Sequence, residues 1–137
     1  MDWGHCVRIF IRKTEPDLQR ISSLLEKAQL RLLHAKTTPV TEKTVSFVVE
    51  DYYEVIKELL VAYLLKDGLK SSNHQCLISY FLKQHPDKER EAILISQLSF
   101  FRNRLDYYGE SIPLYFYKDR KEEFLEVIAL LERLLGS

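Results

Sequence analysis

The residues best suited to chemistry lie together in one segment, Phe100–Gly109, with the sequence FFRNRLDYYG. Arg102 and Asp106 are four residues apart, as are Asn103 and Tyr107, so each pair would meet on one face of a helix. A simple exposed ion pair between Arg102 and Asp106 would stabilise the helix by only about 0.3–0.5 kcal/mol. An arginine–asparagine pair near a helix end is unusual for a solvated face. This segment is therefore the first candidate for a functional site.

A long amphipathic helix over 87–108 would position this segment. Apolar residues recur at alternating spacings of four and three along it, which predicts one stripe facing a core. Gly109 follows the stripe and can supply the left-handed residue that ends a helix. The members of the stripe are Leu94, Leu98, Phe101, Leu105 and Tyr108.

Four further helices are expected, separated by prolines, glycines and cap residues. The second is the most apolar: it carries two adjacent apolar stripes, so it either lies at the centre of a bundle or buries its additional face against another subunit. Thr14 is the expected N-cap of the first helix, and Pro39 the first residue of the second. The four helices are expected over 15–36, 39–66, 73–84 and 119–135.

Two segments fall outside these helices. In residues 1–13, the side chains alternate in character along the chain, a pattern that fits a short strand. The segment could equally form a short helix before the first long one, and both alternatives stay open. Residues 110–118 are expected to form a loop in which Tyr115, Phe116 and Tyr117 cover the core.

Length and composition favour a single all-α domain over residues 1–137. The 137-residue chain is 46% hydrophobic and has only four glycines and four prolines, which is typical of long helices in a globular fold. We expect an antiparallel four- to five-helix bundle. The formal net charge is zero, so nucleic-acid binding would require a local basic patch or a dimer cleft.

The cysteines and glycines exclude several classes of site. Cys6 and Cys76 form no Cys-x-x-Cys motif, and no Cys/His cluster has metal-ligand spacing, so we expect no metal. The glycines are dispersed, which excludes a phosphate-binding glycine loop, and we expect no cofactor. No signal-peptide pattern or membrane span is visible. We therefore expect a cytoplasmic protein with reduced thiols and no membrane association.

Three features of the sequence belong together: Tyr52-Tyr53-Glu54 in the long second helix, Gly68-Leu69-Lys70 followed by His74, and Arg102-Asn103 before a Tyr-Gly end. With these features the chain resembles the HEPN family (higher eukaryote and prokaryote nucleotide-binding domain), in particular its small stand-alone prokaryotic members. The similarity covers about residues 15–135. It implies a helical bundle that usually dimerises and often acts beside a minimal nucleotidyltransferase, as a toxin–antitoxin pair.

The resemblance also implies a site. The family's ribonuclease motif is an arginine, a polar residue and, after a short spacer, a histidine; Arg102 and Asn103 match the first two, but Tyr107 occupies the histidine position. RNA cleavage without metal benefits from a general base and from a cation that stabilises the phosphorane. A tyrosine with a pKa of about 10 is a poor base, so we expect binding rather than cleavage. A histidine from elsewhere in the fold is the alternative.

We therefore expect a nucleotide or RNA ligand and a homodimer. Two alternatives stay open: a metal-independent ribonuclease that uses Arg102, Asn103 and Tyr107, and an interaction module that engages a nucleotidyltransferase without a ligand of its own. Lys70 and His74 are included because binding residues concentrate on loops. The full set of candidate binding residues is Arg102, Asn103, Arg104, Asp106, Tyr107, Lys70 and His74.

Overall fold

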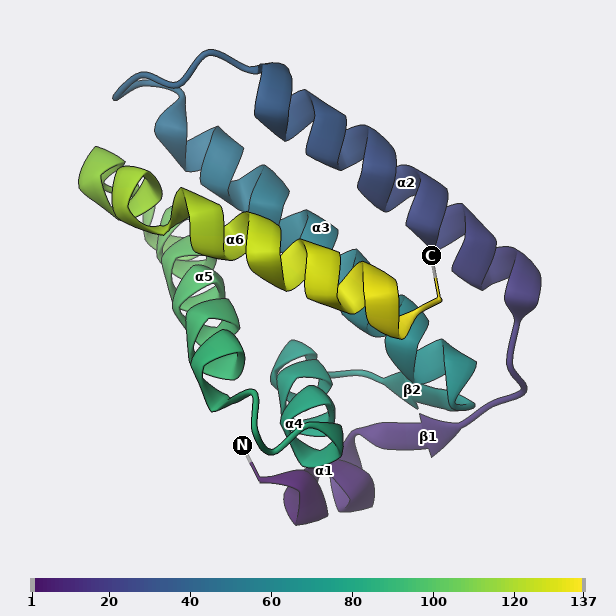
Figure 1. Ribbon diagram of the computed structural model, residues 1–137. Coiled ribbons are helices and arrows are strands. Elements are labelled where there is room, and N and C mark those ends of the chain that lie inside the picture. Colours follow the sequence, from purple (N-terminus) through teal and green to yellow (C-terminus); the bar gives the residue numbers. More distant parts are fainter. Residues whose placement is uncertain (1, 137) are drawn as a thin grey trace.

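Helices make up most of the chain, which confirms the all-α class. A computed structural model describes residues 2–136, which form six helices and a small two-stranded sheet, arranged as in Figure 1. The elements in order are α1 (Trp3–Ile9), β1 (Ile11–Lys13), α2 (Leu18–Thr37), α3 (Val45–Lys66), β2 (Leu69–Ser71), α4 (His74–Gln84), α5 (Glu89–Tyr108) and α6 (Leu114–Leu134).

Helix α3 is the centre of the bundle. It packs against α2, α4, α5, α6 and β2, and Figure 1 shows α6 crossing in front of it, with α2 and α5 to either side. Both of its apolar stripes are buried, including Tyr52 and Ile56, which are completely inaccessible to solvent. Burial of Tyr52 raises the pKa of its hydroxyl to about 12. The wide apolar arc of this helix is therefore satisfied within one chain.

The N-terminal segment takes both of the conformations left open for residues 1–13. The short helix α1 comes first, and β1 then pairs antiparallel with β2, with Arg12 directly opposite Lys70. The backbone N–H of Thr14 donates to the carbonyl of Gly68 at 2.8 Å. Gly68 has a φ of +73°, a conformation that favours glycine, so it ends α3 and starts β2 in one step.

Two helices begin later than expected. Helix α2 starts at Leu18, because the carboxylate of Asp17, and not Thr14, accepts a hydrogen bond from the N–H of Arg20. Helix α3 starts at Val45 rather than Pro39. The hydroxyl of Thr44 donates to the carbonyl of Pro39 at 2.7 Å and ties the preceding residues into a turn. Both corrections come from side-chain hydrogen bonds that compete with helix formation.

Helix α6 begins earlier than expected, so the prediction of a loop over 110–118 is wrong beyond Pro113. The aromatic run belongs to the first turn of α6. Phe116 lies with its ring centroid 4.4 Å from that of Phe101 on α5, and both Phe116 and Tyr117 are buried. The apolar contact with α5 extends the helix toward its N-terminus.

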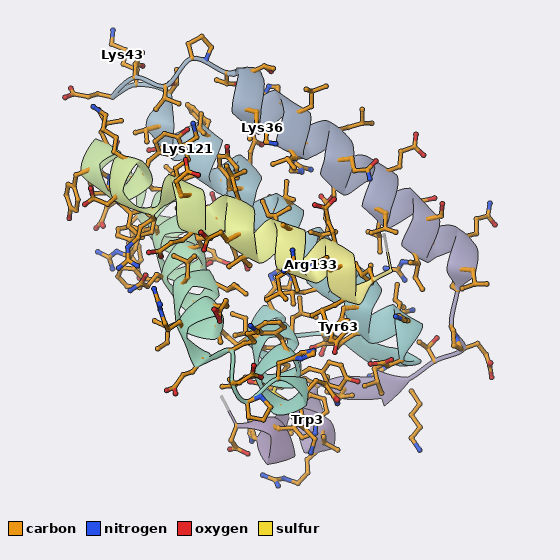
Figure 2. The ribbon with its side chains drawn as sticks, viewed as in Figure 1. Trp3, Lys36, Lys43, Tyr63, Lys121 and Arg133 are labelled. Atoms are coloured by element: carbon orange, nitrogen blue, oxygen red, sulfur yellow. A yellow bond between two sulfur atoms is a disulfide. The ribbon has the colours of Figure 1, made fainter. Side chains whose placement is uncertain are left out.

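A disulfide bond joins Cys6 on α1 to Cys76 on α4, which corrects the expectation of reduced thiols. Both cysteines are fully buried. Figure 2 shows α1 with Trp3 beneath α4, and the ring centroids of Trp3 and Tyr80 are 5.1 Å apart. The bond therefore fastens the N-terminal segment to the bundle.

The structure also bears on the membrane. Within residues 2–136, none of the helices has the length and apolar character required to cross a bilayer.

The disulfide can be tested chemically. It links residues 70 positions apart, and the chain-entropy model gives such a closure a stabilisation of about 4 kcal/mol. We expect the urea midpoint of unfolding to fall in reductant, and alkylation of the denatured protein to label cysteine only after reduction. A Cys6→Ala/Cys76→Ala variant is the control, since its midpoint must not respond to reductant. Labelling of both thiols without reductant would contradict the bond.

Candidate functional site

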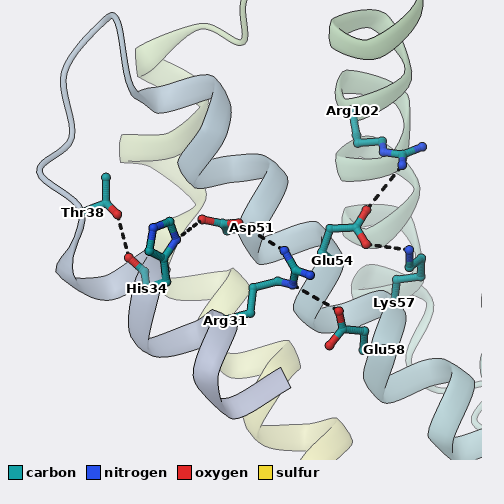
Figure 3. A network of polar contacts seen from close by, with 8 residues as sticks. All are labelled: Arg31, His34, Thr38, Asp51, Glu54, Lys57, Glu58 and Arg102. Carbon is teal, nitrogen blue, oxygen red and sulfur yellow. Dashed lines mark hydrogen bonds and ion pairs between the residues drawn. The ribbon is translucent and has the colours of Figure 1, made fainter. Parts of the chain in front are cut away.

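Arg102 lies on α5 and contacts carboxylates from two helices. Its Nη2 atom is 3.5 Å from Oε1 of Glu54 on α3, and its Nε atom is 3.0 Å from Oδ2 of Asp106, one turn further along α5. The guanidinium carbon also lies 5.9 Å from the ring centroid of Tyr53. Figure 3 shows the pairing of Arg102 with Glu54, and of Glu54 with Lys57. We call Arg102, Asp106, Glu54 and Lys57 the Arg102 cluster.

The Arg102 cluster is balanced in charge. Lys57 Nζ lies 2.6 Å from Oε2 of Glu54, so two cations face two carboxylates. A further carboxyl, Glu50, borders the cluster. Burial raises the pKa of Glu50, and a hydrogen bond with Asp106 and the charge of Asp106 raise it further. Glu50 therefore holds its proton to a higher pH than an ordinary glutamate and adds less negative charge to the site.

The contact between Arg102 and Asp106 is the more exposed of the two pairings. Arg102 Nε is itself buried, yet no acceptor meets it in hydrogen-bond geometry, although Asp106 Oδ2 is only 3.0 Å away. The interaction is thus a charge contact and not a directed hydrogen bond. The side chain of Asp106 is 33% exposed, compared with 15% for Glu54. Asp106 is therefore the partner that a ligand could displace.

His74 opens α4 next to the Arg102 cluster. The neighbouring Gln75 donates from Nε2 to the hydroxyl of Ser99 at 3.1 Å, which holds the start of α4 against α5. Partial burial lowers the pKa of His74, and the positive charges of Lys57 and Arg102 lower it further. His74 is therefore a neutral imidazole at neutral pH and is able to accept a proton.

Exposed aromatic rings surround the end of α5. Tyr107, Tyr108 and Tyr115 are 75%, 68% and 67% exposed. The loop between α5 and α6 brings Phe47 to the same end, because the N–H of Ile112 donates to Ser46 Oγ at 2.8 Å, and Phe47 is also exposed. We call Tyr107, Tyr108, Tyr115 and Phe47 the aromatic end.

The structure brings together some of the residues predicted from sequence and separates others. Arg102, Asp106 and His74 lie in or beside the Arg102 cluster. The side chain of Asn103 makes no hydrogen bond within residues 2–136. Arg104 has its guanidinium carbon 4.5 Å from the ring centroid of Tyr108 and also pairs with Glu110.

Two predicted residues lie apart from the cluster. The hydroxyl of Tyr107 is exposed and makes no hydrogen bond in the part of the chain that the structure describes. Lys70 lies on β2 and lines a different groove, formed with β1 and the start of α2.

Sequence reasoning missed the α3 side of the site. Glu54 and Lys57 are charged residues within a largely buried helix, and that placement is the signal that could have identified them. A charge on such a helix must be paired, and the partner has to come from a neighbouring element.

A second polar network lies beside the Arg102 cluster along α3 and is structural in character. Arg31 Nε lies 3.1 Å from Glu58 Oε1, and His34 Nδ1 lies 2.8 Å from Asp51 Oδ2. Thr38 donates to the carbonyl of His34. Figure 3 shows this network joining α2 to α3. Glu58 is only 5% exposed, so Arg31 pairs a carboxylate that solvent cannot reach.

Within the described residues, no group of three or more His, Cys, Asp or Glu side chains could hold a metal ion. No protein-family model, curated protein or solved structure matches the chain. The case for function therefore depends on the geometry of the site.

Replacing Glu50 by glutamine tests the electrostatics of the site. Because folding raises the pKa of this carboxyl above its ordinary value of 4.5, the folded protein loses stability as the pH rises from that value through the folded-state pKa. We expect Glu50→Gln to raise the melting temperature at neutral pH, with the gain disappearing in acid. Glu42→Gln, in the exposed turn before α3, is the matched control. A gain that persists in acid would refute this interpretation.

Proposed function

We propose that the chain is a HEPN-like module that binds a nucleotide or single-stranded RNA at the end of α5. One observation carries the proposal: the partly exposed Arg102 lies on the same helix end as exposed tyrosine rings and an unengaged asparagine amide. Proteins that bind single strands combine cations for the phosphates with aromatic rings for the bases. The end of α5 has both.

Each residue has a distinct part in this proposal. Arg102 contacts the phosphate, Asn103 donates a hydrogen bond that orients it, and Arg104 adds peripheral positive charge. Tyr107 and Tyr108 offer rings on which bases stack, a contact typically worth about 1–3 kcal/mol per base.

Binding at this site is an exchange of anions. Arg102 already faces two carboxylates, so a phosphate gains little unless it replaces one of them. Asp106 is the more exposed partner and lacks a directed hydrogen bond to Arg102. The phosphate therefore takes the place of Asp106, while Glu54 remains paired with Lys57.

If a phosphate replaces Asp106, the wild type and its variants should differ in affinity for a fluorescent single-stranded RNA in a defined order. Arg102→Ala should weaken binding about tenfold or more, because a charge-assisted contact is lost. Asp106→Asn should tighten binding, because it removes the competing anion. Arg90→Ala, an exposed arginine at the other end of α5, is the control for loss of positive charge and should have little effect.

Two results would count against the proposal. Equal affinity of wild type and Arg102→Ala would remove Arg102 from the site. Weaker binding by Asp106→Asn would show that Asp106 contributes to recognition and does not compete with the ligand. Circular dichroism of each variant establishes that the helices are intact.

A second candidate function is metal-independent RNA cleavage. The lowered pKa of His74 favours it, because a neutral imidazole beside Arg102 is a suitable base for a 2′-hydroxyl. Arg102 would stabilise the phosphorane charge, and the exposed Tyr107 would have no part in the proton transfer.

Cleavage of single-stranded RNA in EDTA tests this second function. We expect any activity of the wild type to be lost in both His74→Asn and Arg102→Ala, and to be retained in His5→Asn. Activity that survives in His74→Asn would exclude His74 as the base. Binding without cleavage in the wild type would leave the binding module as the function.

The proposal extends to partners. The buried stripes of α3 are not available to a second subunit, but α2 packs chiefly on α3 and exposes Leu30 and Leu33. This face of α2 supports a homodimer or a protein-interaction module. A minimal nucleotidyltransferase as partner, in a toxin–antitoxin pair, follows from the family resemblance and belongs to the same proposal. The cytoplasmic location, which we expected because the sequence shows no signal-peptide pattern or membrane span, is proposed with it.

A further inference from the structure

A groove with a basic rim lies between the β-hairpin, the start of α2 and the end of α3. It encloses about 300 Å³ and is lined by Arg12, Arg20 and Lys70. We call it the basic groove. The rest of its lining is mostly apolar, with the side chains Phe10, Val61, Leu64, Leu65, Leu69 and Leu77. None of its residues belongs to the Arg102 cluster.

The three cations of the basic groove have no carboxylate partners. No acidic residue lines the groove, and none of the three charged groups forms an ion pair within residues 2–136. Glu15 and Asp17 line an adjoining cavity that shares Arg20, Leu65 and Lys70, so these two carboxylates offset only part of the charge of the three cations. The groove therefore has an excess of positive charge.

The cross-strand pairing of Arg12 with Lys70 does not stabilise the fold. Arg12 and Lys70 are directly opposite each other in the antiparallel pair, and like charges in that position destabilise a sheet. Proteins commonly retain such unfavourable contacts where a function requires them. An anionic ligand between the two side chains would turn the repulsion into an attraction.

The walls of the groove are held in place before any ligand binds. The N–H of Thr14 donates to the carbonyl of Gly68 at 2.8 Å, and the N–H of Ser72 donates to that of Phe10 at 3.1 Å. The disulfide fixes α1, which precedes β1, to α4. A preformed site loses less conformational entropy on binding.

The lining selects the chemistry of the ligand. The apolar floor is aliphatic except for Phe10, and the hydroxyl of Ser71 already donates to the carbonyl of Asn73 at 2.7 Å. Few polar groups remain to recognise the edge of a base, so the lining suits an aliphatic body. We propose that the basic groove binds an aliphatic chain with an anionic head, either a carboxylate or a phosphate monoester, independently of the site at the end of α5.

Calorimetric titration of the 137-residue chain tests this, with decanoate and decyl phosphate below their micellar concentrations. We expect both to bind, and the tighter of the two identifies the head group. Decyltrimethylammonium, which has the same tail and the opposite charge, and inorganic phosphate, which has no tail, should each bind at least about tenfold more weakly. Within a series of acyl anions, affinity should rise about fourfold per buried methylene until the groove is filled.

Charge variants locate the site. Arg12→Gln/Lys70→Gln should weaken binding about tenfold or more and leave the melting temperature equal or higher, because the like-charge pair is gone. Lys43→Gln is the control, since Figure 2 shows Lys43 extending from the turn before α3, away from the hairpin. Unchanged affinity in the double variant, equal binding of the ammonium compound, or no binding of either anion would overturn the proposal. Should the double variant fail to fold, Lys70→Gln alone provides the same comparison.

Discussion

Helix α3 is buried on nearly every side, and each carboxylate on its inner faces must meet a cation from a neighbouring element. Arg31 on α2 meets Glu58, and Arg102 on α5 meets Glu54. An ionised carboxylate left unpaired in such surroundings would be costly. The two arginines therefore join α3 to the helices that flank it, α2 and α5.

The same constraint defines what the candidate site can do. Arg102 is partly a structural residue, so it is not a free cation awaiting an anion. Its remaining capacity lies on the side of Asp106, where the contact is exposed and poorly directed. A ligand that enters there exchanges one anion for another and leaves the pairing with α3 intact. Recognition then depends as much on the aromatic end as on charge.

Apolar residues that recur at helical spacing over many turns were sufficient to predict the core of the fold. The apolar stripe of α5 packs on the core from Leu94 to Leu105, but its last predicted member, Tyr108, is exposed because it lies beyond the part of α5 that the core covers. The glycine stop is present, with Gly109 at a φ of +65°, and the broad arc of α3 correctly indicated a central helix. The exact helix starts were harder to predict, because side-chain hydrogen bonds compete with helix formation there. The hydroxyl of Thr44 and the carboxylate of Asp17 moved two helix starts, because a single side-chain hydrogen bond can outweigh helix propensity.

Features that depend on contacts between distant segments could not be predicted. A strand was one of the two alternatives for residues 1–13, but β2 has only three residues, too few for an alternating pattern, and the pairing of β1 with β2 was not foreseen. The pairing of Cys6 with Cys76 requires α1 to pack on α4. The same division between local patterns and long-range packing applies to the candidate site. Its α5 residues were visible as a local motif, whereas Glu54, Lys57 and the nearness of His74 depend on how α3 and α4 pack.

The most direct test of a binding site at the end of α5 is ¹⁵N NMR of the arginine Nε–H groups during titration with a short single-stranded RNA. The Nε–H of Arg102 is buried and lacks a directed acceptor in the free protein. We expect its resonance to shift strongly as a phosphate oxygen replaces Asp106, while that of Arg31 stays unchanged. An unmoved Arg102 resonance at saturating RNA, with shifts confined to other parts of the molecule, would contradict it.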